Sequence, residues 1–202
     1  MKVFCIGFNK TGTTSLSKIF ENNKFLVAPQ PPFEYNLESY FYGNYSTFIE
    51  MIKNDYYNYT LFQDVPFSFP NMYKILDENF PNSKFILTIR DNEDEWYKSL
   101  IRFHKKSFSW FNQPEKIHSY VYEGMLYKVL TKVYNSPKTH PYDELFLKNS
   151  YLNHIEDVKS YFKNRDNLLI LNLKTQDVIP KLENFLDIKF EDKEVPHLNQ
   201  SK

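Results

Sequence analysis

Residues 2–15 read KVFCIGFNKTGTTS, and the rest of the architecture can be inferred outward from them. The apolar run at 3–6 predicts a short buried strand, and a loop bounded by Gly7 and Gly12 follows it. The hydroxyl residues at 13–15 then begin a segment with helical apolar spacing. A strand, a tight loop and a helix N-terminus leave free backbone N–H groups at the positive end of a helix dipole. The stretch therefore predicts an anion-binding site.

The loop chemistry favours a phosphate-type ligand over an ordinary turn with N-cap threonines. Lys10 adds a mobile cation, and the hydroxyls add hydrogen-bond donors. The loop is not a Walker A sequence, because Thr13 stands where the lysine after the second glycine is required. A lysine placed before Gly12 would reach the bridging oxygen beyond a 5′-phosphate rather than a γ-phosphate. Asp64 is a weak candidate for holding Mg²⁺.

Composition excludes several classes of protein. The 25 basic and 25 acidic residues are interspersed, so no nucleic-acid partner is expected. The single cysteine, Cys5, cannot form an internal disulfide and suits a reducing compartment. The first apolar run is about four residues long, too short for a signal peptide, and no run approaches the ~18 apolar residues of a membrane span. We expect a cytoplasmic protein with no membrane span.

Strand and helix patterns alternate along the chain, which predicts an α/β fold. A parallel sheet covered on both faces follows from this alternation, in a three-layer α/β/α arrangement. The length suits one domain over 1–202. The predicted strands are 2–6, 25–28, 59–63, 84–90 and 167–172; the predicted helices are 13–23, 46–56, 71–80, 93–105, 118–135, 143–164 and 176–186. Residues 29–45 read as an irregular loop, 107–117 are ambiguous, and 187–202 form a polar tail.

A second candidate site follows the strand at 84–90. Arg90 ends that strand, and Ser99 lies nine residues later in the next helix. Ligands of open α/β sheets bind outside the carboxyl ends of the strands, so Arg90 should share an edge with the loop at 7–14. A guanidinium and a hydroxyl there could clamp a second phosphate. The alternative is a surface ion pair between Arg90 and a nearby acid such as Asp91.

Four blocks in order along the chain resemble the sulfotransferases that use 3′-phosphoadenosine 5′-phosphosulfate (PAPS). Residues 7–16, GFNKTGTTSL, are similar to the 5′-phosphosulfate loop, and 84–91, KFILTIRD, to the 3′-phosphate segment. The stretches YLNH at 151–154 and VPHLN at 195–199 are similar to a sulfotransferase-like branch of the family. Family members have Arg-Asp-Pro and a serine eight residues after the arginine, whereas this chain has Asn92 and a spacing of nine. The resemblance implies the P-loop-like sulfotransferase fold.

The resemblance also implies roles for individual residues. Lys10 would contact the bridging oxygen, Arg90 and Ser99 would hold the 3′-phosphate, and no metal is expected. With the family's Arg-Lys-Gly tail absent, His197, Asn199 and Lys202 would cover the nucleotide instead. The 5′-phosphate would be held by Asn9, Thr11, Gly12, Thr13, Thr14 and Ser15.

The acceptor's proton requires a general base. Asp64 is the first candidate, since it ends a predicted strand at the same edge; its alternative is a loop-capping carboxylate. His154 belongs to a family block but lies beside an apolar stripe, which favours a structural hydrogen bond. His104 is a third candidate, and Glu34 lies in the loop at 29–45, which is long and aromatic enough to form a substrate lid.

The acceptor class and the assembly stay open at this point. A small-molecule or carbohydrate acceptor with a hydroxyl or an amine fits the resemblance, with 3′,5′-adenosine bisphosphate as the product of PAPS. Two other functions remain: a P-loop kinase of a nucleotide or small molecule, and a catalytically silent protein that binds PAPS or the bisphosphate. A homodimer is compatible with either reading.

Overall fold

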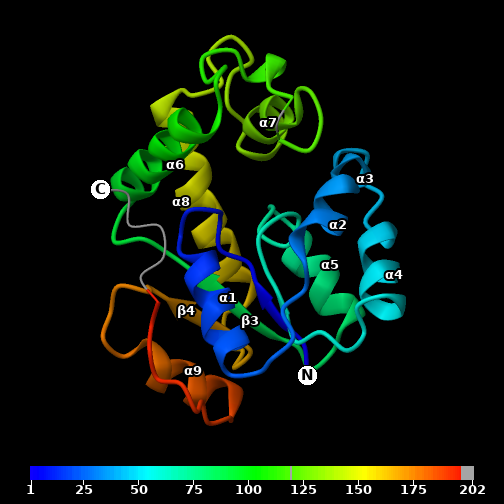
Figure 1. Ribbon diagram of the computed structural model, residues 1–202, viewed down its shortest axis with the longest axis vertical. Helices are drawn as coiled ribbons and strands as arrows, with labels where there is room; N and C mark the ends of the chain where they lie inside the picture. Colours follow the sequence, from blue (N-terminus) through cyan, green and yellow to red (C-terminus); the bar gives the residue numbers. More distant parts are fainter. Residues whose placement is uncertain (119, 197–202) are drawn as a thin grey trace.

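A computed structural model describes residues 1–118 and 120–196, and it has a parallel sheet at its centre (Figure 1). The four strands lie in the order β2-β1-β3-β4, and every neighbouring pair is parallel. Their bounds are β1 Val3–Cys5, β2 Leu61–Phe62, β3 Lys84–Thr88 and β4 Leu168–Leu171. The predicted α/β class with a central parallel sheet is confirmed.

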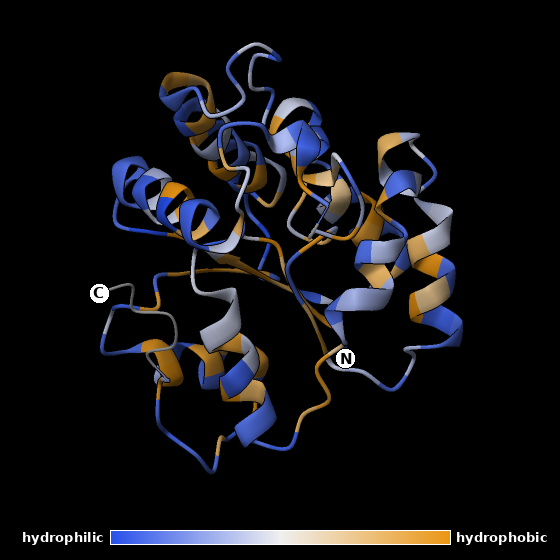
Figure 2. Ribbon diagram, turned by 45° about the horizontal axis from the view of Figure 1, so that its top comes forward, coloured by the Kyte–Doolittle hydropathy of each residue, from blue (hydrophilic) through white to orange (hydrophobic). Residues whose placement is uncertain are grey.

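Alternate strand residues point to opposite faces of the sheet, and both faces are covered by helices. On one face, Phe4 and Phe85 belong to a core that includes α5 (Met72–Asn79) and α8 (Glu144–Tyr161). On the other face, the core joins β-strand residues to α1 (Thr13–Asn22) and α9 (Val178–Leu186), as in Val3, Cys5, Ile86, Leu16, Ile19, Leu182 and Leu186. The apolar sheet is therefore enclosed between amphipathic helices (Figure 2).

Helix α6 (Glu93–Ser107) begins immediately after the end of β3 and packs against α8. Asn92, which replaces the family's proline, is its N-cap, and the side chain accepts a hydrogen bond from the Glu95 N–H at 2.9 Å. Acidic residues occupy the first turn, and Lys105 and Lys106 occupy the last. Both charge placements complement the helix dipole. This cap fixes where α6 starts, and hence which of its residues face the sheet edge.

The prediction of an irregular loop over 29–45 is wrong. The chain forms two short helices there, α2 (Gln30–Tyr35) and α3 (Leu37–Phe41), followed by α4 (Ser46–Asn54). Prolines in the first turn of α2 are compatible with a helix start, because the N–H groups of that turn have no intrahelical partner. Burial of Phe33 and Leu37 then supplies the packing that holds both helices.

The helix expected over 118–135 is also only partly correct. Val121 and Gly124 have positive φ values of 66° and 75°, which interrupt helical geometry before α7 (Met125–Lys128). A π-helical segment, Val129–Val133, continues α7, and a 3₁₀ turn, Pro114–Lys116, lies in the ambiguous region. The strand expected over 25–28 contributes an isolated bridge from Val27 to Leu61.

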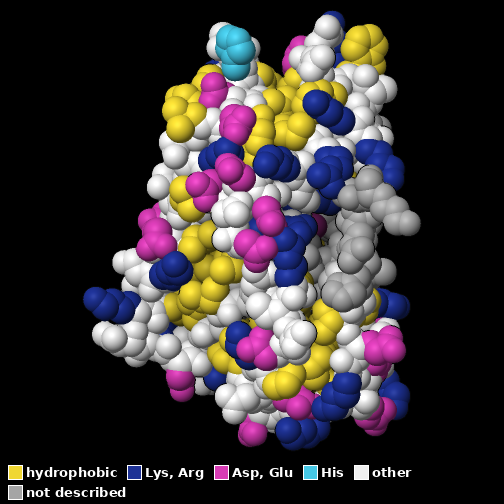
Figure 3. Space-filling model, turned by 90° about the vertical axis from the view of Figure 1, so that its left-hand side faces the viewer, with side chains coloured by type: hydrophobic (Ala, Val, Ile, Leu, Met, Phe, Trp, Pro, Cys, Tyr) yellow, Lys and Arg dark blue, Asp and Glu magenta, His cyan; other side chains and the backbone are white. Residues whose placement is uncertain are grey.

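Charged side chains of both signs are interspersed over the face shown in Figure 3, as the balanced composition predicts. Within residues 1–118 and 120–196, no helix combines the length and the apolar character needed to cross a membrane.

Candidate functional site

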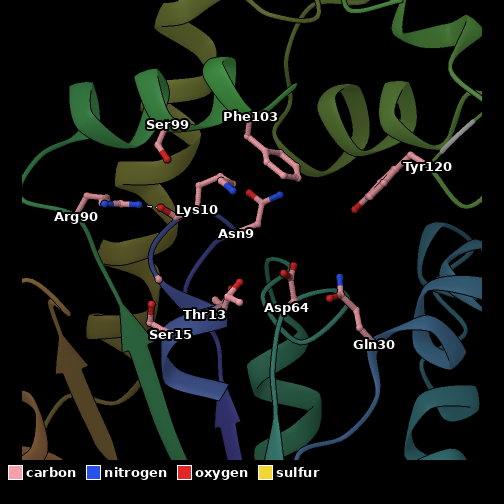
Figure 4. Close-up of a pocket in the computed structure, with 12 residues that line it drawn as sticks. Asn9, Lys10, Thr13, Ser15, Gln30, Asp64, Arg90, Ser99, Phe103 and Tyr120 are labelled. Atoms are coloured by element: carbon pink, nitrogen blue, oxygen red, sulfur yellow. Dashed lines mark hydrogen bonds between the residues drawn. The ribbon is translucent and has the colours of Figure 1, made fainter. Parts of the chain in front are cut away.

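A cavity of about 210 Å³ opens at the carboxyl edge of the sheet (Figure 4). Side chains from the loop after β1, the residues after β2 and β3, helix α6 and the start of α2 converge on it. It is lined by Asn9, Lys10, Gly12, Thr13, Thr14, Ser15, Gln30, Asp64, Arg90, Ser99, Phe103 and Tyr120. The two regions that the sequence places at one edge therefore meet in one cavity.

The N-terminus of α1 forms the floor of one half of this cavity. Its N-cap, Gly12, has φ 105°, and no described side chain caps the free N–H groups. The first turn carries no acidic residue, so nothing there opposes an anion. A Cβ on Gly12 would lie 2.4 Å from Leu173 Cδ1, so any other residue there would force the Leu173 side chain to move. The geometry is that of a helix-terminus anion site.

Lys10 sits at the front of the loop in the left-handed region, with φ 68°. This backbone conformation is unfavourable for a residue with a Cβ, so the surrounding contacts must hold it in place. Its Nζ lies 3.6 Å from the ring centroid of Phe103, a cation–π contact inside the cavity. Burial lowers the pKa of Lys10, Asp64 raises it, and Arg90 lowers it further.

Arg90 reaches the same loop from the end of β3. Its Nε donates to the Lys10 carbonyl oxygen at 2.7 Å, and its backbone N–H donates to the Tyr151 hydroxyl at 2.8 Å. Ser99 projects from α6 toward this pair (Figure 4). The alternative was a surface ion pair between Arg90 and a nearby acid such as Asp91. Asp91 instead forms an ion pair with Lys174 at 2.8 Å.

Aromatic side chains hold the loop after β1 and Arg90 in place. Trp96 donates through Nε1 to the Asn9 carbonyl oxygen at 3.0 Å, and the Tyr134 hydroxyl donates to Asn9 Oδ1 at 2.9 Å. The rings of Trp96 and Tyr151 stack with centroids 4.8 Å apart. Buried aromatic side chains lose little freedom on packing, so they hold a site firmly.

Asp64 follows β2 on the opposite side of the cavity and faces Gln30 and Tyr120 (Figure 4). Its φ of 62° is left-handed, a conformation that aspartate tolerates better than most residues. Burial, with a smaller contribution from the nearby Glu34, raises the pKa of its carboxyl to about 6 against the opposing effects of the Val65 backbone and Lys10. A carboxylate with this pKa, beside a cationic loop, is suited to accept a proton near neutral pH.

Some residues expected at the site lie elsewhere. The Thr11 hydroxyl donates to the Phe8 carbonyl oxygen at 2.5 Å and shares a hydrogen bond of 2.6 Å with Thr88, so it faces the sheet. His154 is buried outside the cavity, stacked on Phe8 with centroids 4.3 Å apart. His104 is buried against Tyr142. Residues His197, Asn199 and Lys202 lie outside the described residues.

Three lining residues were not expected. Phe103 lies one helical turn after Ser99, so the i, i+4 spacing on α6 could have indicated it. Gln30 reaches the cavity only because α2 forms where a loop was expected. Tyr120 carries no sequence signal that distinguishes it from the other tyrosines.

The sulfotransferase domain family matches the chain over residues 2–202, and the chain belongs to this family. The family implies a transferase that moves a sulfuryl group to an acceptor substrate. None of the curated proteins is similar enough to the chain to count as a match. Across residues 1–118 and 120–196, no three His, Cys, Asp or Glu side chains gather as a set of metal ligands.

Proposed function

We propose that the protein transfers a sulfuryl group from PAPS to a hydroxyl or amine of a small-molecule or carbohydrate acceptor, as a single domain over residues 1–202. The observation that carries this proposal is the meeting of Lys10 and Arg90 in one cavity, joined by the 2.7 Å hydrogen bond. Two cations at a helix N-terminus provide for two separate phosphates of one nucleotide.

The donor half of the cavity fits the chemistry of PAPS. The α1 N-terminus and the hydroxyls at 13–15 would hold the 5′-phosphate. Arg90, with Ser99 beside it, would hold the 3′-phosphate that separates this donor from ATP.

When bound, PAPS supplies an activated sulfuryl group whose leaving group is the 5′-phosphate. Lys10 would neutralise negative charge that develops on the bridging oxygen. Asp64, on the acceptor side, would take the proton of the attacking hydroxyl. The main contribution of the chain is to align these groups, as in phosphoryl transfer.

Calorimetry with the full chain tests the donor assignment. We expect 3′,5′-adenosine bisphosphate to bind in the micromolar range without magnesium, and to bind more tightly than Mg-ATP. A preference for Mg-ATP would contradict the proposal and favour the kinase alternative. Bisphosphate binding without sulfate transfer to any member of a broad acceptor panel would instead support a silent binding protein.

A further inference from the structure

The cavity is electrically polarised from one end to the other. Lys10 and Arg90 lie at the donor end, whereas Asp64 lies at the other end with Glu34 close enough to affect its pKa. Glu34 sits one turn along α2 from Gln30 and is half-buried. In the described part of the chain, neither carboxylate has an ion-pair partner within 4.0 Å. The acceptor end therefore holds negative charge that is not compensated by a salt bridge.

Gln30 is fixed so that it presents an acceptor oxygen to this end. Its Nε2 donates one of its two N–H groups to Glu34 Oε1 at 2.5 Å, which fixes the orientation of the amide. Its oxygen points toward Asp64 across the cavity (Figure 4). The Gln30 oxygen and the Asp64 carboxylate both accept hydrogen bonds, so a ligand that brings N–H or O–H donors to this end can bind to both.

The surrounding groups favour a positively charged donor. Burial raises the pKa of Glu34, and burial, with added contributions from Asp64 and Glu34, raises the pKa of the Tyr120 hydroxyl. These shifts indicate carboxylates that are poorly solvated and that lie near each other. The Tyr120 hydroxyl points into the same end of the cavity (Figure 4). An ammonium group would satisfy the acceptors and the charge together.

We propose that Gln30, backed by Glu34, recognises an ammonium group on the acceptor while the reacting hydroxyl of the acceptor faces Asp64. The preferred acceptors are then cationic amino alcohols or aminophenols. This inference rests on the proposed function and identifies the acceptor class of that same site. The reaction needs no additional reactant, because the ammonium group is only bound and the hydroxyl alone loses its proton.

Three phenols of similar frame test the charge preference: tyramine is cationic, 4-ethylphenol neutral and 4-hydroxyphenylacetate anionic. Their binding to the full chain is measured by calorimetry with and without 3′,5′-adenosine bisphosphate, and their sulfation with PAPS. We expect tyramine to bind about tenfold more tightly than 4-ethylphenol, and the anion to bind most weakly. Tyramine binding that is no tighter than that of 4-ethylphenol, or that is undetectable, overturns the inference.

Variants then assign the preference to the residues named. Glu34→Gln should reduce the tyramine-to-ethylphenol ratio toward one, and Gln30→Met provides a second route to the same loss. The matched control is Glu50→Gln, an exposed position on α4, which should keep the ratio. A ratio that survives both cavity variants overturns the inference.

The two proposals fail in different ways. If 4-ethylphenol is sulfated as well as tyramine while the bisphosphate binds, the inference fails and the proposed function stands. If the bisphosphate does not bind but tyramine is still preferred, the proposed donor is wrong and the cationic site stands.

Discussion

Arg90 holds the main chain of Lys10, because its Nε donates to the Lys10 carbonyl oxygen at 2.7 Å. The two residues are 80 positions apart in the chain, and each is proposed to bind a different phosphate. The same hydrogen bond supports Lys10 in its left-handed conformation, with φ 68°. Arg90 is therefore expected both to bind the donor and to shape the loop that binds it.

Replacing Arg90 should affect two ligands unequally. Arg90→Ala removes the proposed 3′-phosphate contact, so binding of 3′,5′-adenosine bisphosphate should weaken about ten- to a hundredfold. AMP lacks that phosphate, so its affinity should fall less, and only because the Lys10 loop is disturbed. Arg90→Lys keeps the charge but has no Nε donor in a planar fork, so it should recover only part of the affinity. Calorimetry measures all three; equal weakening for both ligands would contradict the 3′-phosphate assignment.

Replacing Lys10 should remove transfer and leave the fold intact. Its side chain extends into the cavity and contacts Phe103, so Lys10→Ala removes little packing. We expect kcat to fall about 10²- to 10³-fold, the usual cost of losing one group that stabilises developing charge. Circular dichroism and the melting temperature check the fold. The matched control is Lys18→Ala at an exposed position on α1, which should keep kcat. A Lys10→Ala variant with normal kcat would remove the residue from the mechanism.

The parts of the site that the sequence predicts are those set by local pattern and sheet topology. The glycines and hydroxyls of the first loop are contiguous, so their shared position follows from one strand-to-helix turn. Arg90 follows a continuous apolar strand, β3, which ends at Thr88, and parallel strands bring their carboxyl ends to one edge. Both predictions of position required only that the strand segments be identified.

The parts that the sequence does not predict depend on tertiary packing. The prolines beside Gln30 suggest a loop, yet burial of Phe33 stabilises α2 and brings Gln30 to the cavity. The helical apolar spacing over 118–135 continues through Val121, whose left-handed backbone no periodicity reveals. Tyr120 reaches the cavity because of that interruption, so local pattern could not have identified it.

Gly12 should be intolerant of any side chain. Gly12→Ala places a Cβ at φ 105° and 2.4 Å from Leu173 Cδ1. The expected costs are about 1–2 kcal/mol of backbone strain and about 1–3 kcal/mol of overpacking. Gly43→Ala is the matched control, because Gly43 also has positive φ, 73°, but an open surrounding, so it should show the strain alone. Urea unfolding measures both. Equal destabilisation would mean that the contact with Leu173 relaxes without cost, and the double variant with Leu173→Ala would confirm this.

The Asp64 carboxylate should lower the free energy of unfolding in the same pH range in which it acts as the base. Its folded pKa, about 6, exceeds the ordinary value of 3.8, so the folded state binds the proton more tightly. The stability from this proton is complete below about pH 4 and is lost as the pH rises to about 6. Asp64→Asn should therefore raise the free energy of unfolding at pH 7.5 by about 1–3 kcal/mol.

Activity should respond to pH and to the Asp64→Asn change in the direction opposite to stability. If Asp64 is the base, kcat/KM rises through about pH 6 to a plateau, and Asp64→Asn lowers kcat about 10²- to 10⁴-fold. The pH profile of transfer and the urea titration are measured on the same variant. A less active variant with unchanged stability would mean that the carboxylate is better solvated than its burial implies. A fully active variant would exclude Asp64 as the base.

His154 provides the converse case of a buried residue without a role in proton transfer. Its Nε2 donates to the Ile6 carbonyl oxygen at 2.8 Å, and burial lowers its pKa to about 4. It lies under the Phe8 ring, away from the cavity that contains Lys10 and Asp64. His154→Gln can keep an N–H donor for Ile6, so we expect kcat within about threefold of the parent, far from the 10²- to 10⁴-fold loss of a general base. The free energy of unfolding should fall by about 1–3 kcal/mol, because the stacked ring is lost. A large loss of kcat with unchanged stability would contradict a purely structural role for His154.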